Sequence, residues 1–430
     1  MSAPSGEPNA QRSTPTATPP APGSAPPVRA PADRTVTVLA LVLLAVNLRL
    51  VLAGVSPLLP EIRHARGLST AGSGALTTVP VLCLGLLAPA APALAARFGA
   101  PRVLLGCLTG LAAGAALRCL PGSGWLFAGT VLAGCCIAVA NVLLPSVVRG
   151  AFPDRIGTLT GVSTMLVSGG AALAAGGAAA LERTLGGDWR PALAVWAVPA
   201  LAAAALWVRP SRRTGRPATL PGPAGRPHGP SAGHRLRRSG LAWQLTLFMG
   251  LQSLLAYALM AWLPQFYRDQ GESAAAAGGV LAVLSLASIP SSLLVPMVAA
   301  RVRGQAPVAL AVVLCSAAGL TGLLLAPVTG ALVWAVLLGL GQGGELGLAL
   351  TLINLRSSHP AQTAALSGMA QSVGYCLAAC GPLSLGVLHD ATGGWTWPLT
   401  ALLLLTLPLT VTGMGAGRSP ATRSAARLPR

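Results

Sequence analysis

Two charged residues lie inside long apolar runs, and their side chains are the best placed in this chain to do chemistry. Arg49 follows Arg34 by 15 residues and precedes Glu61 by 12. Glu345 precedes Arg356 by 11 residues. In a helix that rises about 1.5 Å per residue, both side chains lie roughly 16–20 Å from the nearest end. The planar guanidinium of Arg49 suits a small anion, a carboxylate or a nitro group, and Glu345 could either balance that charge or carry a proton.

The other reactive residue types show no spacing typical of an enzyme or a metal site. The chain contains no Lys and no Gly-x-x-x-x-Gly-Lys-Ser/Thr segment, which disfavours an ATP-driven pump. An enzyme should carry paired His or Asp residues, so we expect no enzyme activity, no cofactor and no metal. The histidines are scattered (His64, His228, His234, His359 and His389), and we interpret the eight cysteines as small apolar packing residues.

The elements that must position Arg49 and Glu345 are membrane-spanning helices. Of 430 residues, 53% are hydrophobic and 9% are charged, against about 25% charged in an ordinary soluble domain. Apolar stretches of about 20 residues recur, each long enough to cross a hydrocarbon core of roughly 30 Å. We predict an all-α integral membrane protein with twelve transmembrane helices. The predicted spans are 36–59, 73–96, 103–120, 125–148, 157–181, 191–208, 242–266, 274–300, 307–328, 331–354, 361–388 and 397–415.

The basic residues predict how the chain is oriented. All 29 are Arg, which indicates GC-rich codons and a bacterial source. With the N-terminus in the cytoplasm, 22 arginines lie inside, six lie outside and Arg49 lies in a span, as the positive-inside rule requires. We therefore predict a multi-pass protein of the bacterial plasma membrane with both termini cytoplasmic. The arginines behind the net charge of +19 then lie mostly at the surface of a lipid bilayer, so this charge does not indicate a nucleic-acid partner. The six outer arginines are Arg63, Arg66, Arg118, Arg183, Arg190 and Arg268.

The sequence repeats itself at a shift of 204 residues. The aligned pairs include Gly67 with Gly271, Ser69 with Ser273, Gly74 with Gly278 and Ser168 with Ser372. Two parallel halves of six spans predict a transporter with its site near the bilayer midplane. We divide the chain into a disordered cytoplasmic N-terminal tail (1–34), an N-terminal half (35–208), an Arg/Pro-rich cytoplasmic linker (209–241), a C-terminal half (242–415) and a basic cytoplasmic tail (416–430).

Further motifs run along nearly the whole membrane region. They are Asn47-Leu-Arg49 with Ser56-Pro-Leu-Leu-Pro60, Leu76-Thr-Thr-Val-Pro-Val-Leu-Cys83, Asn141-Val-Leu-Leu-Pro145, Gln252-Ser253 with Tyr257, Ala261-Trp-Leu-Pro264, Gly339-Leu-Gly-Gln-Gly343 and Ser367-Gly-Met-Ala-Gln-Ser-Val-Gly-Tyr375. With these motifs the chain resembles the major facilitator superfamily, and more narrowly its cyanate and 2-nitroimidazole transporter (CynX/NimT) branch. One departure follows the second span, where Ala96 replaces the acidic residue of the superfamily's Asp-Arg pair.

The resemblance implies which residues form the site. In the superfamily the first, fourth, seventh and tenth spans line a central cavity, and the polar residues there are expected to bind substrate. Gln371 and Tyr375 of the predicted eleventh span are added because each can donate and accept hydrogen bonds. Arg97 and its repeat partner Arg301 are expected to act in gating, although a latch built on the missing carboxylate cannot operate in its usual form. The expected substrate-binding residues are Asn47, Arg49, Asn141, Gln252, Tyr257, Gln342, Glu345, Gln371 and Tyr375.

The function expected from residues and resemblance together is secondary transport. The substrate would be a small anion or a nitro-aromatic or other polar organic solute, and a monomer would move it by alternating access. The sequence does not decide whether a proton is coupled to this transport. Broad efflux of drugs or metabolites by proton antiport is the alternative, and a membrane-embedded enzyme is a remote one. For each neutral polar residue, a hydrogen bond between helices is an equally good interpretation.

Overall fold

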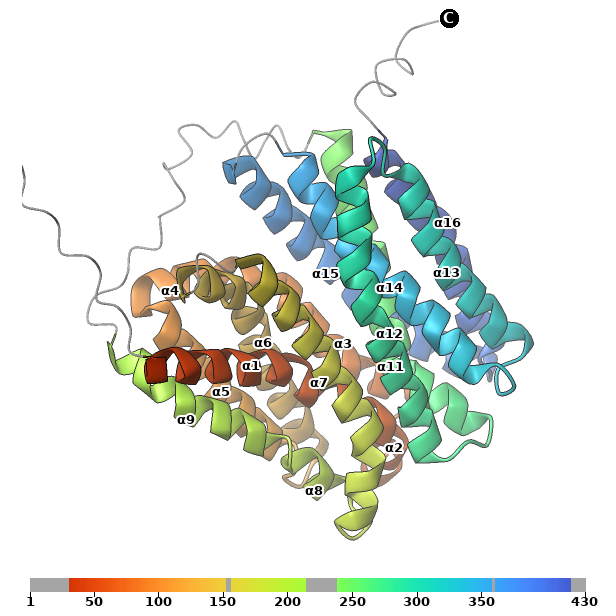
Figure 1. The fold of residues 1–430 in the computed structure, drawn as a ribbon. Helices are drawn as coiled ribbons and strands as arrows, with labels where there is room; N and C mark the ends of the chain where they lie inside the picture. The colour runs from red at the N-terminus through yellow and green to blue at the C-terminus, as the bar shows by residue number, and fades with distance from the viewer. Residues whose placement is uncertain (1–30, 152–155, 214–237, 358–359, 419–430) are drawn as a thin grey trace, which may run out of the picture.

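A computed structural model describes residues 31–151, 156–213, 238–357 and 360–418. These residues fold into helices joined by short turns (Figure 1), and twelve segments are long and apolar enough to cross a membrane. The predicted all-α fold with twelve spanning helices is thereby confirmed. The predicted disordered tail up to residue 30, most of the Arg/Pro-rich linker and the tail after residue 418 lie outside the described residues.

The N-terminal half contains spans one to six. Its elements are α1 (Pro31–Ala53), η1 (Ser56–Leu58), α2 (Leu59–Arg66), α3 (Thr70–Leu87), η2 (Ala88–Ala90), α4 (Ala91–Phe98), α5 (Ala100–Leu117), α6 (Ser123–Ala151), α7 (Ile156–Thr184), α8 (Trp189–Ala194) and α9 (Ala197–Arg213). The first two spans are interrupted by the 3-10 turns η1 and η2, where the prediction had continuous runs. Pro57 and Pro89 lie in these turns, and proline cannot supply the backbone N–H that a regular helix needs.

The C-terminal half contains spans seven to twelve. They are α11 (Gly240–Asp269), α12 (Ala274–Arg301), α13 (Ala306–Leu325), α14 (Ala331–Leu355), α15 (Pro360–Thr392) and α16 (Thr396–Gly417). We call the end where α9 stops and α11 begins the linker end, and the end that carries α2 and α8 the distal end (Figure 1). The helix α9 continues to Arg213, so the first residues of the predicted linker are helical.

The 204-residue repeat has a physical basis at the start of the second and eighth spans. Gly67 and Gly271 both have a positive φ, +61° and +91°, a conformation that favours glycine. Two residues later, the Ser69 hydroxyl accepts a hydrogen bond from Gly72 N at 3.0 Å, and the Ser273 hydroxyl accepts one from Ala276 N at 3.1 Å. Each serine thus caps the N-terminus of its helix, which satisfies a backbone donor left open at that end.

The same repeat shapes the contact between the halves. The helix α3 packs against α15, and the repeat-related helix α12 packs against α7. A Cβ on Gly74 would lie 2.7 Å from the Pro382 carbonyl oxygen, and one on Gly278 would lie 2.4 Å from the Ala175 carbonyl oxygen. Repeat-related glycines therefore allow backbone-to-backbone contact at both crossings, as small residues do between membrane helices.

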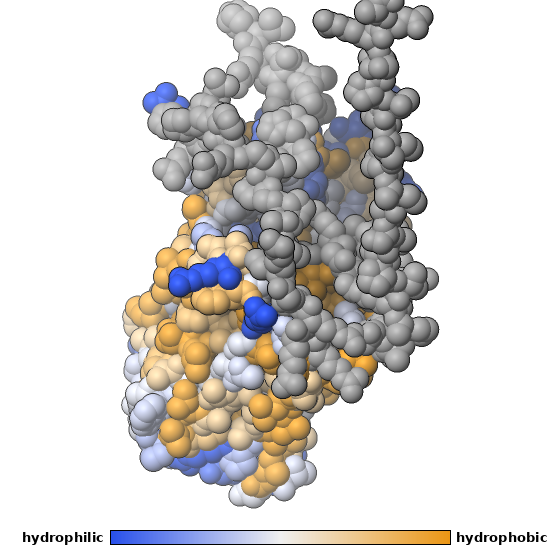
Figure 2. Space-filling view, turned by 90° about the vertical axis from the view of Figure 1, so that its left-hand side faces the viewer, coloured by the Kyte–Doolittle hydropathy of each residue, from blue (hydrophilic) through white to orange (hydrophobic). Residues whose placement is uncertain are grey.

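The halves share a core at the distal end, and a second cluster joins Tyr257, Ala378 and Ala379 to the N-terminal half. Val55, Leu58, Ile62 and Leu76 of the N-terminal half belong to the same buried cluster as the apolar residues of α11 to α14. Arg268 at the end of α11 also forms a salt bridge with Glu61 of α2. The described part of the face shown in Figure 2 is largely apolar, as a lipid-facing surface must be. Large exposed apolar side chains also occur on α13 and α16, such as Leu325 and Val411.

Gly278→Ala should weaken the distal contact between the halves, because its methyl group would overlap the Ala175 carbonyl. Overpacking of this kind typically costs about 1–3 kcal/mol, so we expect a lower unfolding temperature and slower transport. A Cβ on the neighbouring Gly279 would have no heavy atom within 4 Å, and Gly279→Ala is the matched control. Equal behaviour of the two variants in thermal unfolding and transport assays would contradict the proposed close contact.

Candidate functional site

A central cavity of about 360 Å³ lies between the two halves. Its walls come from α1, α6 and α7 of the N-terminal half and from α11, α12, α14 and α15 of the C-terminal half. The resemblance had implied the helices of spans one, four, seven and ten, and the predicted residues Gln371 and Tyr375 lie in span eleven. The structure adds spans five and eight. The lining extends to Val148 and Leu350 in the linker-end portions of α6 and α14.

Arg49 is the only charged side chain among the described residues that line this cavity. Its guanidinium carbon lies 5.1 Å from the ring centroid of Tyr257, a cation–π distance. No described carboxylate forms a salt bridge with it, and no described residue takes one of its hydrogen-bond donors. The site is therefore electropositive, with a donor fork free to bind a ligand.

Two tyrosines extend the site across the interface between α11 and α15. Tyr257 and Tyr375 meet edge to face with ring centroids 6.3 Å apart. Both line the cavity, so the guanidinium of Arg49 and two aromatic rings meet on one wall. This arrangement offers stacking surface and hydroxyl groups to a flat polar solute.

The predicted amide residues differ in whether their side chains already form hydrogen bonds within the protein. Gln252 donates to Met249 O at 3.1 Å and to Ser253 Oγ at 2.7 Å, and Gln371 donates to Ser367 Oγ at 2.8 Å. Gln342 has a buried Nε2 with no partner among the described residues. All three line the cavity together with Asn141, and Gln342 and Asn141 are the amides with free donors there.

Asn47 lies outside this cavity, although the motif shared with Arg49 predicted it as a substrate contact. It is fully buried, and its Nδ2 donates to Leu43 O at 2.7 Å and to Pro199 O at 3.1 Å. The physical reason is helical geometry, because residues two apart on a helix point to different faces. Asn47 therefore joins α1 to α9, and only Arg49 faces the solute path.

Glu345 also lies outside the cavity, and the ion pair with Arg49 that we considered does not form in this structure. The carboxylate is fully buried and accepts a hydrogen bond from Ser316 Oγ at 2.7 Å. Its Oε2 has no partner among the described residues. Glu345 thus connects α14 to α13 on the side away from the cavity.

The two arginines predicted to act in gating, Arg97 and Arg301, are exposed at the linker end. Arg97 lies over the ring of Phe98 with its guanidinium carbon 5.2 Å from the centroid. None of the described acidic residues forms a salt bridge with either arginine. Their positions at the ends of α4 and α12 are equivalent in the repeat.

The sequence analysis missed a row of serines on α12. Ser285, Ser288 and Ser292 line the cavity, and each hydroxyl donates to a carbonyl of its own helix, which leaves its oxygen able to accept. Their spacing of three and four residues places them on one helical face. That spacing was the available signal in an otherwise apolar span.

Twelve spanning helices around a central cavity that holds a charged side chain are typical of the class of membrane transport proteins. Residues 41–379 match the Major Facilitator Superfamily, and the chain belongs to that family.

Two curated relatives and one solved structure illustrate this membership. The chain is 40% identical over 397 residues to the 2-nitroimidazole transporter of Escherichia coli (strain K12), covering 91% of this chain and 98% of the relative. It is 31% identical to the cyanate transport protein of the same organism, covering 86% and 94%. A bacterial homologue of the human lysosomal transporter Spinster, in an inward-facing and occupied crystal structure, superposes with a TM-score of 0.75 at 16% identity, covering 92% and 99%.

Asn47→Ala should lower stability without changing substrate affinity. The variant loses two hydrogen bonds between buried groups, and leaving a buried carbonyl unpaired costs about 1–3 kcal/mol. We expect a lower unfolding temperature, together with a KM close to that of the wild type. An increase in KM at unchanged stability would show that Asn47 contacts the solute after all.

Proposed function

We propose that this protein is a secondary transporter that moves a small anion or a nitro-aromatic solute through the central cavity by alternating access, as a monomer. The observation that carries the proposal is Arg49, the only charged lining residue among those described, with its donors free. A cation at this depth is costly unless it faces a cavity or a partner. A ligand with negative charge on two oxygens would supply that partner.

The shape and chemistry of the cavity support a small flat solute. A volume of about 360 Å³ is at the lower end of the roughly 300–1,000 Å³ typical of small-molecule sites. Nitroimidazole and cyanate, which name two relatives of this chain, are both compact and present electron-rich atoms to a donor. Tyr257 and Tyr375 could stack against an aromatic ring while Arg49 binds the nitro or anionic group.

The packing of the halves supports alternating access. The halves are held together at the distal end by close backbone crossings and the pair of Arg268 with Glu61, whereas the cavity lining runs toward the linker end. With the termini in the cytoplasm of a bacterial cell, as the arginine distribution predicts, the described conformation would present the site to the inside. Rocking of one half against the other would reverse that access.

Arg49→Ala should reduce transport at least tenfold for anionic and nitro substrates, since removing one member of a buried charged hydrogen bond costs about 2–5 kcal/mol. Arg49→Lys should recover part of the rate for simple anions, because it keeps the charge and loses the planar fork. Initial rates from reconstituted vesicles over a panel of cyanate, carboxylates and nitroimidazoles measure this. Arg303→Ala, at an exposed site away from the cavity, is the control. Normal transport of every accepted solute by Arg49→Ala would overturn the site.

Efflux by proton antiport is the second candidate, and Glu345 is the observation that favours it. Its Oε2 is buried without a partner among the described residues, and it lies near the middle of α14. A carboxyl group in this setting is a candidate to load and release a proton.

Glu345→Gln should transport at close to the wild-type rate without a pH gradient, because Glu345 does not line the cavity. Substrate-driven proton flux in vesicles then separates the two candidates. Undiminished flux would remove the proton role and leave Glu345 as a link to Ser316. Loss of proton flux with substrate exchange intact would assign Glu345 as the proton carrier. Ser316→Ala tests whether losing the hydrogen bond to Glu345 is enough to change the proton flux.

A further inference from the structure

Arg118 is a second buried cation, which the sequence analysis counted among the outer arginines. It follows the end of α5 and is 1% exposed. It reaches this position because α5 and α6 cross closely at Gly114 and Gly129. A Cβ on Gly129 would lie 3.0 Å from Cγ of Arg118 and 2.5 Å from the Gly114 carbonyl oxygen. Small residues on α6 thus admit a large basic side chain into the interior.

The guanidinium of Arg118 is only partly satisfied by the protein. Its Nη1 donates to Val51 O of α1 at 2.9 Å. Both Nε and Nη2 are buried with no hydrogen-bond partner among the described residues, and no described carboxylate forms a salt bridge with it. A buried charge without a counter-charge costs several kcal/mol, so this cation calls for a partner of opposite charge.

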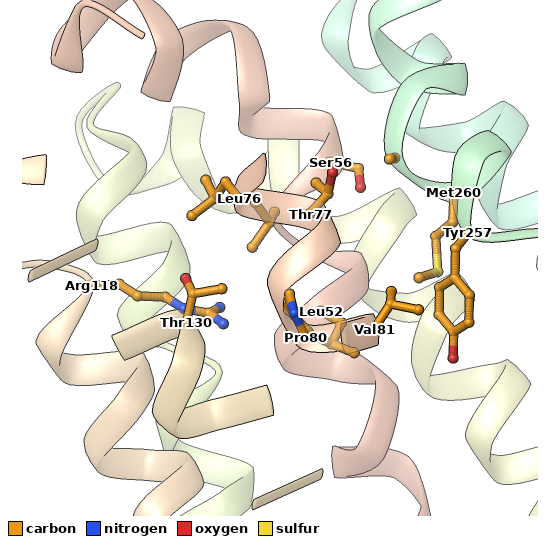
Figure 3. Close-up of a pocket in the computed structure, with 12 residues that line it drawn as sticks. Leu52, Ser56, Leu76, Thr77, Pro80, Val81, Arg118, Thr130, Tyr257 and Met260 are labelled. Atoms are coloured by element: carbon orange, nitrogen blue, oxygen red, sulfur yellow. The ribbon is translucent and has the colours of Figure 1, made fainter. Parts of the chain in front are cut away.

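Arg118 is one of the residues that line a small pocket, together with mostly apolar side chains (Figure 3). Four residues with hydroxyl groups line it, Ser56, Thr77, Thr130 and Tyr257, and Thr130 lies beside the guanidinium. The Thr130 hydroxyl donates to Leu126 O at 2.8 Å. The enclosed space is about 30 Å³, and a water molecule needs roughly 10–15 Å³ of such space. The pocket therefore has room for a species of one to three non-hydrogen atoms.

This pocket is distinct from the central cavity. Tyr257 and Met260 line both spaces and stand between them. Arg49 lies over the ring of Tyr257 on the cavity side, whereas Arg118 lines only the smaller pocket. The two cations thus serve separate spaces.

We propose that the Arg118 pocket is a second anion site, which binds a monovalent anion of one to three non-hydrogen atoms, such as a halide. The guanidinium supplies the charge and two donors, and Thr130 is the hydroxyl residue beside it. The site goes beyond the proposed transport function, because it does not depend on Arg49 or on the identity of the transported solute.

Bromide binding to the purified full-length protein tests the site. Thermal unfolding is followed while bromide replaces gluconate at constant sodium concentration, since gluconate is too large for the pocket. We expect a saturable rise in unfolding temperature, as for any ligand that binds the folded state. Arg49→Gln should keep this rise, and Arg118→Gln should lose it. Bromide anomalous diffraction should place a peak beside Nη2 of Arg118.

A second variant covers the case in which Arg118→Gln does not fold. Thr130→Val keeps the shape and the cation and removes one hydroxyl, so the half-saturating bromide concentration should rise at least threefold. Identical unfolding temperatures in bromide and gluconate would overturn the site, as would a bromide response that Arg49→Gln abolishes. An unchanged bromide response in Arg118→Gln or in Thr130→Val would overturn it as well. A lost transport activity in Arg49→Ala with this response intact would leave both proposals standing separately.

Discussion

The structure depends on one constraint, which is that a polar group in hydrocarbon must find its partner within the protein. Three charges deep in the helix bundle meet this constraint in different ways. Glu345 is held by Ser316 within one half. Arg118 donates once to Val51 and keeps two donors toward a small pocket. Arg49 faces the cavity between the halves. Of the three charges, only Arg49 lines the cavity through which we propose that the solute passes.

Glycine and serine make the arrangement possible at low cost. Gly74 and Gly278 let backbones meet across the interface, and Ser69 and Ser273 cap the helices that carry them. Because these pairs are related by the repeat, the two crossings between the halves are alike, and neither half has to deform for the other to fit. The scaffold is thus repeated, whereas Arg49, Arg118 and Glu345 occur in one half each.

The twelve helices were predictable because length and apolarity determine a membrane span directly. The 3-10 turns at Pro57 and Pro89 were harder to predict from the sequence, because many membrane helices tolerate a proline without such a turn. Seven of the nine predicted substrate residues line the cavity, and Asn47 and Glu345 do not. Depth along a helix follows from counting residues, but the direction of a side chain requires the rotation of the helix. The burial of Arg118, which was counted among the outer arginines, was missed for a similar reason, because it depends on a crossing between α5 and α6 that no local pattern reveals.

The bridge between Glu61 and Arg268 has a consequence for the medium around the protein. Both side chains are about one quarter exposed, 22% and 26%, so dissolved ions reach the pair and weaken it. Screening extends over about 8 Å at physiological ionic strength and less in concentrated salt. The apolar crossings beside it do not respond in that way. The cohesion of the distal end therefore decreases as the water around it becomes saltier, and the ionic strength on that side of the membrane affects the balance between the two halves.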